Sequence, residues 1–453
     1  MAPNSMKFQK RQQGAVALVI ALVLVFGMAV MAFFANRGMI FEQKTSANQY
    51  RATRAFEVAE AGIEWALAQL NDDRYLANAP SCAPGSGTPK RSFRERYLQP
   101  STTLPVTFSP LTTTRAGCSI AADGSLTCSC PTGTNAPTLG SSTDPRFTVL
   151  FSSGGDATTV EIISYGCTNA GAACDPVSTD TPDASAVVRV LAKVRPKFPN
   201  APGAGVVAGA AATTGGSLNV INLDVESNGI TINSGTPVVL GAGTSVVTLP
   251  GTPPRASILD NDPSLSALTN ADVNGDLYFQ SFFGETQAQY QANPQTWVIT
   301  GDGQCGSRAP RCRTCGNSGA CGDAAVALLN EGVTQFWIER DVQFNNGRLP
   351  TVGTIGEAQR PIIMAGTGEV EFNGNIVAYG MFYVGGANAL ATWEYNGSGN
   401  AQIFGTFIAR GNFKRGNGNL DLIYSPSVYR NGEGTGVLVR VPGSWRDARD
   451  AFL

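Results

Sequence analysis

The sequence contains no histidine among its 453 residues. Histidine is the side chain that most often acts as a general base near neutral pH, and it is the commonest ligand of transition metals. Its absence excludes a Ser-His-Asp triad, a Cys-His pair and every zinc site that needs an imidazole ligand. We therefore expect a protein that is not an enzyme and that carries no cofactor.

Charged residues are also scarce. They make up 15% of the chain, against roughly 25% in typical soluble domains, and the formal net charge is -2. Because nucleic acids are bound by clustered lysine and arginine, the sequence predicts no nucleic-acid partner. The 52 glycines exceed the average of about 7% and predict many tight turns. The length allows two or three domains.

The cysteines are even in number and lie in segments rich in glycine, serine, threonine or proline. The membrane signal described below exports them to an oxidising compartment, where disulfides persist. We predict disulfides for the whole set: Cys82, Cys118, Cys128, Cys130, Cys167, Cys174, Cys305, Cys312, Cys315 and Cys321. A zinc site formed by the last four is the alternative, although their spacing differs from the paired CxxC of zinc ribbons.

An uncharged segment runs from Ala15 to Ala35. As a helix it would be about 32 Å long, enough to cross the hydrocarbon core of a bilayer. Lys7, Lys10 and Arg11 precede it, so the positive-inside rule leaves the N-terminus in the cytoplasm and sends the rest outward. A cleaved secretory signal is the alternative, but its apolar core would span only about 7–15 residues.

The helical pattern continues beyond the apolar segment, because residues 36–70 contain no proline. Small or apolar side chains recur there at helical spacing, at Ala55, Ala59, Ala66 and Leu70. We predict one helix over residues 15–73, far longer than the globular mean of about 11–12 residues. Something must pack along such a helix, so these four residues, and Val19 in the apolar segment, are candidates for helix packing.

Residues 74–198 predict a small head domain. The segments "RFTVLFSS", "VEIISYG" and "SAVVRVLAKVRP" alternate in the manner of half-buried antiparallel strands. Cys167 and Cys174 lie in a turn between two of them and are expected to form a bridge. Cys128 and Cys130 are too close in sequence to pair comfortably with each other.

Residues 199–453 predict a large, mainly-β domain. Short strands separated by glycine or asparagine at 203–250 and 360–445 favour a β-helix or another solenoid, with an ordinary sandwich as the alternative. Residues 255–345 are expected to form an insertion with a helical piece at "DLYFQSFFGETQAQYQAN". The fold class is α+β: a long N-terminal transmembrane helix, a small antiparallel head and a large mainly-β C-terminal domain.

The N-terminal region resembles the PilX-type minor pilins of the type IV pilus system. The resemblance rests on a basic leader that ends at Gly14, the apolar run from Ala15, and "AFEVAEAGIEWA" at residues 55–66. It implies that a prepilin peptidase removes residues 1–14 and leaves Ala15 as the N-terminus, usually methylated in this family. It also implies a pilin-like fold and no catalytic activity.

Val19 departs from the pattern of major pilins, which resemble one another in carrying a glutamate five residues after the cut. An unpaired acid in the membrane costs roughly 2.5–3.5 kcal/mol, so a subunit with no earlier neighbour does better without it. The resemblance thus implies a subunit that primes or caps the filament at its tip. Its partners would be the other minor pilins, the major pilin and a PilY-type tip adhesin. It would lie in the inner membrane before assembly and in the extracellular pilus afterwards, where it would serve cell adhesion.

Three other functions stay open. A K-type pseudopilin of type II secretion would share the anchor and the missing glutamate. A membrane-anchored, β-helical carbohydrate-active enzyme would use paired acids such as Glu369 and Glu371, although an ordinary solvated strand face explains this pair as well. A free-standing anchored adhesin would keep its leader.

Overall fold

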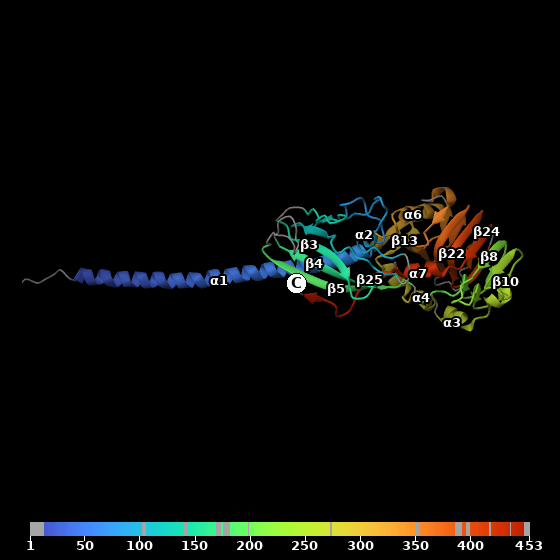
Figure 1. Ribbon diagram of the computed structural model, residues 1–453, viewed down its shortest axis with the longest axis horizontal. Coiled ribbons are helices and arrows are strands. Elements are labelled where there is room, and N and C mark those ends of the chain that lie inside the picture. The colour runs from blue at the N-terminus through green and yellow to red at the C-terminus, as the bar shows by residue number, and fades with distance from the viewer. Residues whose placement is uncertain are drawn as a thin grey trace, which may run out of the picture.

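A single helix, α1 (Gln13–Leu70), forms the stem of the molecule and is 58 residues long. The computed structural model describes residues 13–101, 106–139, 143–168, 174, 182–197, 199–271, 274–349, 353–385, 392–395, 399–415, 418–434 and 436–447. Figure 1 shows the first part of α1 projecting as a free rod from one end of a folded body. The predicted long N-terminal helix is thus confirmed, and it is continuous because nothing between its ends breaks helical geometry.

The C-terminal part of α1 packs on strands β3, β4 and β5 of an antiparallel sheet. The sheet has seven strands in the order β2-β1-β3-β4-β5-β25, with β26 also paired to β5. Their bounds are β1 (Ala116–Ile120), β2 (Leu126–Ser129), β3 (Arg146–Ser153), β4 (Thr159–Cys167), β5 (Ser185–Arg195), β25 (Val437–Arg440) and β26 (Arg446–Asp447). A short helix, α2 (Phe93–Tyr97), lies beside the end of α1. The predicted antiparallel head is confirmed, and its three longest strands fall on the three predicted segments.

The end of the chain returns to this head. β25 and β26 both pair antiparallel with β5, although the sequence placed residues 199–453 together in the β-domain. The alternation of "GVLVRV" fits an edge strand of either sheet, so the local pattern could not decide between them. The structure assigns residues 437–447 to the head sheet.

The remaining strands pair in parallel and form a sheet of thirteen strands, one of four and one of two. The strands are β6 (Val206–Ala208), β7 (Ala212–Thr214), β8 (Ser217–Ile221), β9 (Ile232–Ser234), β10 (Val238–Leu240), β11 (Thr244–Val247), β12 (Ile258–Leu259), β13 (Thr296–Gly301), β14 (Cys312–Cys315), β15 (Gln335–Ile338), β16 (Val342–Asn345), β17 (Thr354–Ile355), β18 (Ile362–Gly366), β19 (Val370–Asn373), β20 (Ile376–Val384), β21 (Thr392–Tyr395), β22 (Asn400–Ala409), β23 (Asn412–Arg415) and β24 (Asn419–Ile423).

The order of strands in the large sheet differs from their order in the chain. Its main path is β11-β8-β24-β22-β20-β18-β15-β13-β14. We call each coil of the backbone that adds a strand to this sheet a turn of the domain. The last turn along the chain, at β24, lies against the first turn, at β8. A solenoid whose turns follow one another along the chain is not confirmed. The segment 255–345, predicted as an insertion, supplies β13, β14 and β15 to this same sheet.

One column of buried side chains holds the turns of the large sheet together. Residues in register on successive strands point into the same core, so each turn covers the apolar side chain of the turn before. The column is Trp297, Phe336, Met364, Phe382, Phe407, Val206, Ile232 and Ile258. All eight side chains are buried.

The β-domain also contains helices and short 3-10 turns. The helices are α3 (Pro263–Ala271), α4 (Asp276–Phe283), α5 (Gln287–Ala292), α6 (Ser318–Asn330) and α7 (Pro426–Gly434), and the 3-10 turns are η1 (Pro254–Ser257), η2 (Gly306–Arg308) and η3 (Asn346–Arg348). α4 and α5 coincide with the predicted helical piece. α4 packs its aromatic side chains against Tyr290 of α5 and Tyr383 of β20, in a second core outside the sheet.

Disulfides join all ten cysteines. The pairs are Cys82–Cys130, Cys118–Cys128, Cys167–Cys174, Cys305–Cys312 and Cys315–Cys321. The last two pairs use the four cysteines of the alternative zinc site, so those sulfurs are not available as thiolate ligands. Each bridge closes a loop within one domain, and none links the head to the β-domain.

Candidate functional site

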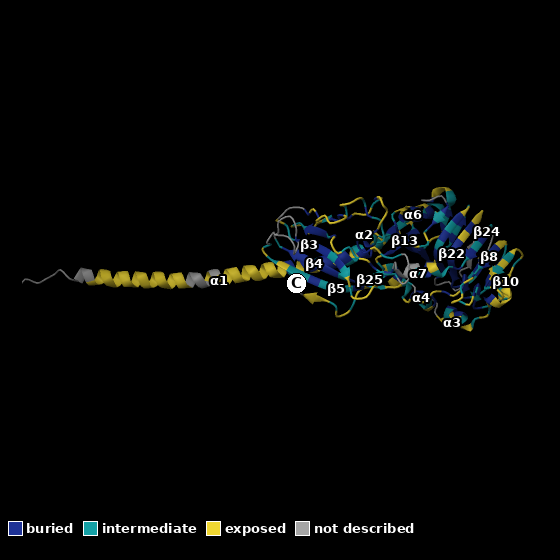
Figure 2. Cartoon of the chain, viewed as in Figure 1, coloured by how far each residue is buried: buried dark blue, intermediate teal, exposed yellow. Residues whose placement is uncertain are grey.

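The free half of α1 is the most unusual surface of the molecule. Residues 16–34 have a mean hydropathy of 3.0, and none of this window is buried. Every residue of 16–54 whose side chain the structure describes is exposed, as the yellow stem in Figure 2 shows. A helix of 19 residues is about 28 Å long, which matches the hydrocarbon core of a bilayer. This surface needs lipid or other apolar helices around it.

The predicted processing residues lie at the start of this helix. α1 begins at Gln13, so Gly14 and Ala15 occupy its first turn, while residues 1–12 are outside the described part of the chain. Val19 lies one turn further on and is 60% exposed. The cut between Gly14 and Ala15 stays a prediction.

The other predicted packing residues lie in the second half of α1 and face the head of the same molecule. Ala55, Ala59, Ala66 and Leu70 are fully buried. The helix and the sheet approach closely because small side chains face each other. A Cβ added to Gly166 of β4 would lie 2.2 Å from the carbonyl oxygen of Ala55. The surface packed along this half is therefore the chain's own sheet.

Three parts of the chain hold the C-terminal end of α1. The Arg94 side chain of α2 donates from Nε to the carbonyl oxygen of Leu70 at 2.9 Å, and so satisfies a free carbonyl of the last turn. The side chain of Asn71 exchanges two hydrogen bonds with the backbone of Leu438 in β25, at 2.9 and 2.8 Å. These contacts tie α1 to α2 and to the returning end of the chain.

The third part is the β-domain, which meets the end of α1 at Asp73. One carboxylate oxygen, Oδ2, lies 3.3 Å from Nζ of Lys197 and accepts a hydrogen bond from Thr334 at 2.8 Å. The other, Oδ1, accepts one from Nε2 of Gln295 at 3.1 Å. Arg360 donates to the Asp73 carbonyl at 2.9 Å. Asp73, Lys197, Gln295, Thr334 and Arg360 form what we call the junction.

The electrostatics of the junction fix its charge state. Burial would raise the pKa of the Asp73 carboxyl, but the positive charges of Lys197, Arg94 and Arg360 outweigh burial and hold this pKa below its usual value. Burial lowers the pKa of the Lys197 ammonium, and Asp73 offsets part of that shift. Asp73 is therefore ionised at neutral pH and is held by cations from both domains.

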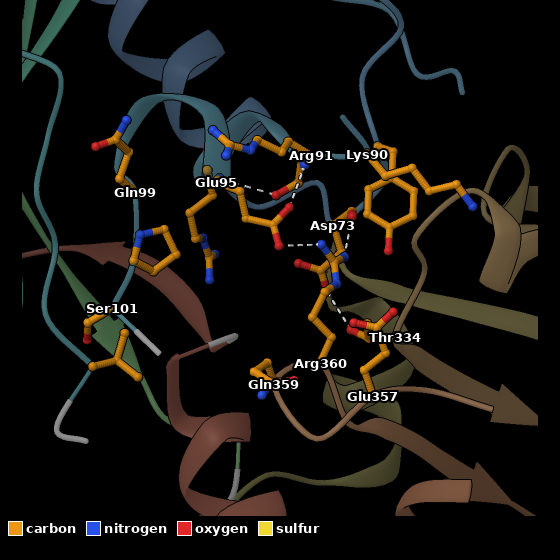
Figure 3. A pocket seen from close by; sticks show the side chains of 15 residues that line it. Asp73, Lys90, Arg91, Glu95, Gln99, Ser101, Thr334, Glu357, Gln359 and Arg360 are labelled. Carbon is orange, nitrogen blue, oxygen red and sulfur yellow. Dashed lines mark hydrogen bonds and ion pairs between the residues drawn. The ribbon is translucent and has the colours of Figure 1, made fainter. Parts of the chain in front are cut away.

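A cavity of about 680 Å³ opens beside the junction, between head and β-domain. Figure 3 shows Arg360 reaching across it from the β-domain toward Glu95 and Asp73. Its Nη1 lies 2.6 Å from Oε1 of Glu95, and its guanidinium lies 4.7 Å from the centre of the Tyr75 ring. The charged groups that line this side of the cavity thus bind one another across the domain boundary.

The described residues contain no group of three or more Asp, Glu, Cys or His side chains placed to hold a metal ion. Two acids were considered for an enzyme, Glu371 in β19 and Glu369 just before it, and both are half-buried. Glu371 accepts a hydrogen bond from Nε2 of Gln343 at 2.8 Å, across the two-stranded sheet.

Sequence reasoning missed the junction, although two of its members stood at predicted domain boundaries. Asp73 ends the predicted helical region, and Lys197 lies beside the boundary at residue 198. A charged residue at each of two boundaries was the only signal. Thr334, which is 261 residues away from Asp73 in the chain, gave none.

Comparison with known proteins supports the interpretation of α1. Residues 13–64 match the PilX N-terminal family, which confirms the resemblance drawn from the sequence. No curated protein matches the chain. Among solved structures, the competence-associated pilin ComZ from Thermus thermophilus aligns over 88% of this chain and 98% of its own, at 13% identity and a TM-score of 0.22. At that score the two structures superpose poorly.

Proposed function

Because residues 13–64 form a PilX-type N-terminal region, we propose that the chain is a minor pilin that assembles through α1 at the tip of a type IV pilus. The observation that carries this proposal is the exposed apolar surface of residues 16–34. Burying each large apolar side chain of this helix gains roughly 1.5–3 kcal/mol. Lipid covers the surface before assembly, and neighbouring pilin helices cover it afterwards.

The mechanism is physical. A prepilin peptidase cuts after Gly14 in the inner membrane, and the helix then leaves the bilayer among sister helices. The head and the β-domain are carried outward as one unit, because the junction fixes the end of α1 to both of them. Neither step needs a catalytic group in this chain, and we propose that it is not an enzyme.

The tip position is supported by Val19. A shaft subunit has an earlier neighbour whose terminal amine can pair with an acid at this position, while the first subunit has none. The β-domain would then face outward, where it would contact a PilY-type adhesin or a surface. The other minor pilins and the major pilin would pack against α1.

The intact mass of the membrane-extracted chain tests the assembly role. We expect a mature chain that starts at Ala15 and carries one methyl group. Gly14→Val blocks the cut and gives a chain that keeps residues 1–14, with no incorporation into pili. A soluble chain that has lost the apolar segment to signal peptidase would contradict the proposal.

Substitution of Val19 tests the tip position separately. Val19→Glu places an unpaired acid in the membrane at roughly 2.5–3.5 kcal/mol, so we expect fewer pili per cell. Val19→Leu is the matched control and should leave the number of pili unchanged. Normal piliation with Val19→Glu would mean that a neighbour pairs with the acid, as in a shaft subunit.

A further inference from the structure

One end of the parallel β-domain has no strand beyond it. β10 ends the four-stranded sheet and pairs with β7 alone, while β11 ends the large sheet and pairs with β8 alone, among the described strands. In Figure 1, β10 lies at the end of the molecule opposite the free end of α1. The outer edges of β10 and β11 thus present unpaired main-chain N–H and C=O groups on the side away from the stem.

The apolar core continues to this end without a cover. Val246 of β11 is in register with Val220 of β8; Val220 is fully buried, whereas Val246 is only partly buried. Leu240 of β10 is in register with Thr214 of β7 and is 40% exposed, against 3% for Thr214. Stacked repeats normally end in a capping unit with a polar outer face. We call this surface, formed by β10 and β11, the open end.

Charged side chains do not block strand pairing at the open end either. Residues 227–254 contain no charged side chain, although exposed edge strands usually carry lysine or another charge that blocks pairing. Large apolar side chains are exposed on the strands at this end, at Val239, Leu240, Val247 and Leu259. Proline residues flank the two strands and none lies within them, so their main-chain groups stay available for pairing.

We propose that the open end binds an extended, uncharged polypeptide segment of another subunit, which adds a parallel strand to β11 or β10. Main-chain groups in register select a polypeptide, because only a peptide backbone supplies donors and acceptors at strand spacing. The half-exposed side chains of Val246 and Leu240 select small apolar residues at alternate positions, as in the strands beneath them.

A second copy of this chain fits the open end less well. Two copies that meet at the same surface are related by a twofold axis, so their edge strands would run antiparallel. All strand pairs in the β-domain are parallel among the described residues, including the pairs that β10, β11 and β12 form at this end. The proposal does not depend on assembly through α1, because strand addition needs only the folded β-domain.

A peptide that copies residues 216–223 (GSLNVINL) is the probe. It contains β8, which β11 already accepts as a parallel neighbour on its inner edge. We expect saturable binding of the labelled peptide to the full-length chain in detergent, measured by fluorescence anisotropy. A scrambled peptide should not bind.

Two lysine variants test the strand edges, and a third is their control. Val246→Lys in β11 and Leu240→Lys in β10 each place a charge at the exposed end of the core. The variant in the strand that accepts the peptide should weaken peptide binding by roughly tenfold or more. Val225→Lys changes an equally apolar but non-strand residue and should leave binding unchanged. Unchanged thermal unfolding of all three variants shows that they fold.

Two results would overturn the proposal. One is the absence of saturable binding, or binding that neither Val246→Lys nor Leu240→Lys weakens. The other is a dimer in sedimentation experiments that either lysine variant dissociates, because a second copy would then occupy the open end. A chain that binds the peptide but is neither cut before Ala15 nor incorporated into pili would reject the proposed function alone.

Discussion

The two halves of α1 share one backbone geometry and have opposite surroundings. Residues 16–54 are exposed wherever their side chains are described, while Ala55, Ala59, Ala66 and Leu70 are fully buried against the chain's own head. The free half begins with large apolar side chains that meet no protein, and the packed half uses small ones that let a sheet approach. The difference shows that helix formation alone does not decide what α1 contacts; side-chain size and apolarity do.

This contrast has a physical consequence for function. The packed half obtains its stabilisation within one molecule, so it should respond to substitutions in any folding assay. The free half obtains its stabilisation only from lipid or from other helices. Substitutions that keep it apolar should therefore leave the stability of the isolated chain unchanged. Four predictions test this division.

The largest effect is expected at the junction, which fixes the end of the packed half. Asp73→Asn removes the negative charge and leaves Lys197 buried without its ion-pair partner, which should lower the free energy of unfolding by about 3–5 kcal/mol. Urea unfolding of the oxidised chain in detergent at pH 7, followed by tryptophan fluorescence, measures the change. A loss below about 1 kcal/mol would mean that water reaches the junction and screens it.

The same variant predicts a difference in pH dependence. The pKa of Asp73 is lowered in the folded chain from 3.8, so the unfolded chain binds more protons as the pH falls through this range. The stabilisation from Asp73 is complete above the unfolded pKa and is lost as the pH falls toward the lower folded value. The Asp73→Asn variant should lack this pH-dependent stabilisation. Plotted against pH, the free energies of unfolding of the variant and of the unchanged chain should therefore converge below about pH 4.

A matched pair of leucines sharpens the comparison within α1. Leu70 is fully buried and Leu24 is 60% exposed. Leu70→Ala should lower the free energy of unfolding by about 2–5 kcal/mol, because it opens a cavity under the helix. Leu24→Ala should change it by less than about 0.5 kcal/mol. Equal effects in detergent would show that the free half also packs on protein in the isolated chain.

The sequence predicted both halves of α1 because their information is local. An uncharged run and a proline-free segment with small residues at helical spacing are visible within 58 residues. The head strands were also predicted, since alternation within "RFTVLFSS" and "SAVVRVLAKVRP" needs no distant partner. The local patterns are strongest in residues 13–64, and there the match to the PilX N-terminal family confirms the resemblance predicted from the sequence.

What the sequence did not show is long-range. The stacking of β24 on β8 joins residues about two hundred positions apart, and each strand alone fits several neighbours. The return of β25 to the head and the meeting of Asp73 with Thr334 are of the same kind. Such pairings depend on which surfaces remain uncovered once the local elements have formed. The spacing of residues in the sequence does not indicate which surfaces these are.

The smallest effect is expected where the returning end of the chain meets the packed half. Arg440 of β25 forms an ion pair with Glu64 of α1, and both side chains are largely exposed, at 42% and 68%. Arg440→Ala should lower the free energy of unfolding by only about 0.2–1 kcal/mol, and less at high salt. Arg54→Ala, which removes a pair with Glu57 within α1 itself, is the control and should cost no more than about 0.5 kcal/mol. A loss above about 2 kcal/mol in Arg440→Ala would show that this ion pair, rather than the buried alanines and Leu70, keeps the packed half on the head.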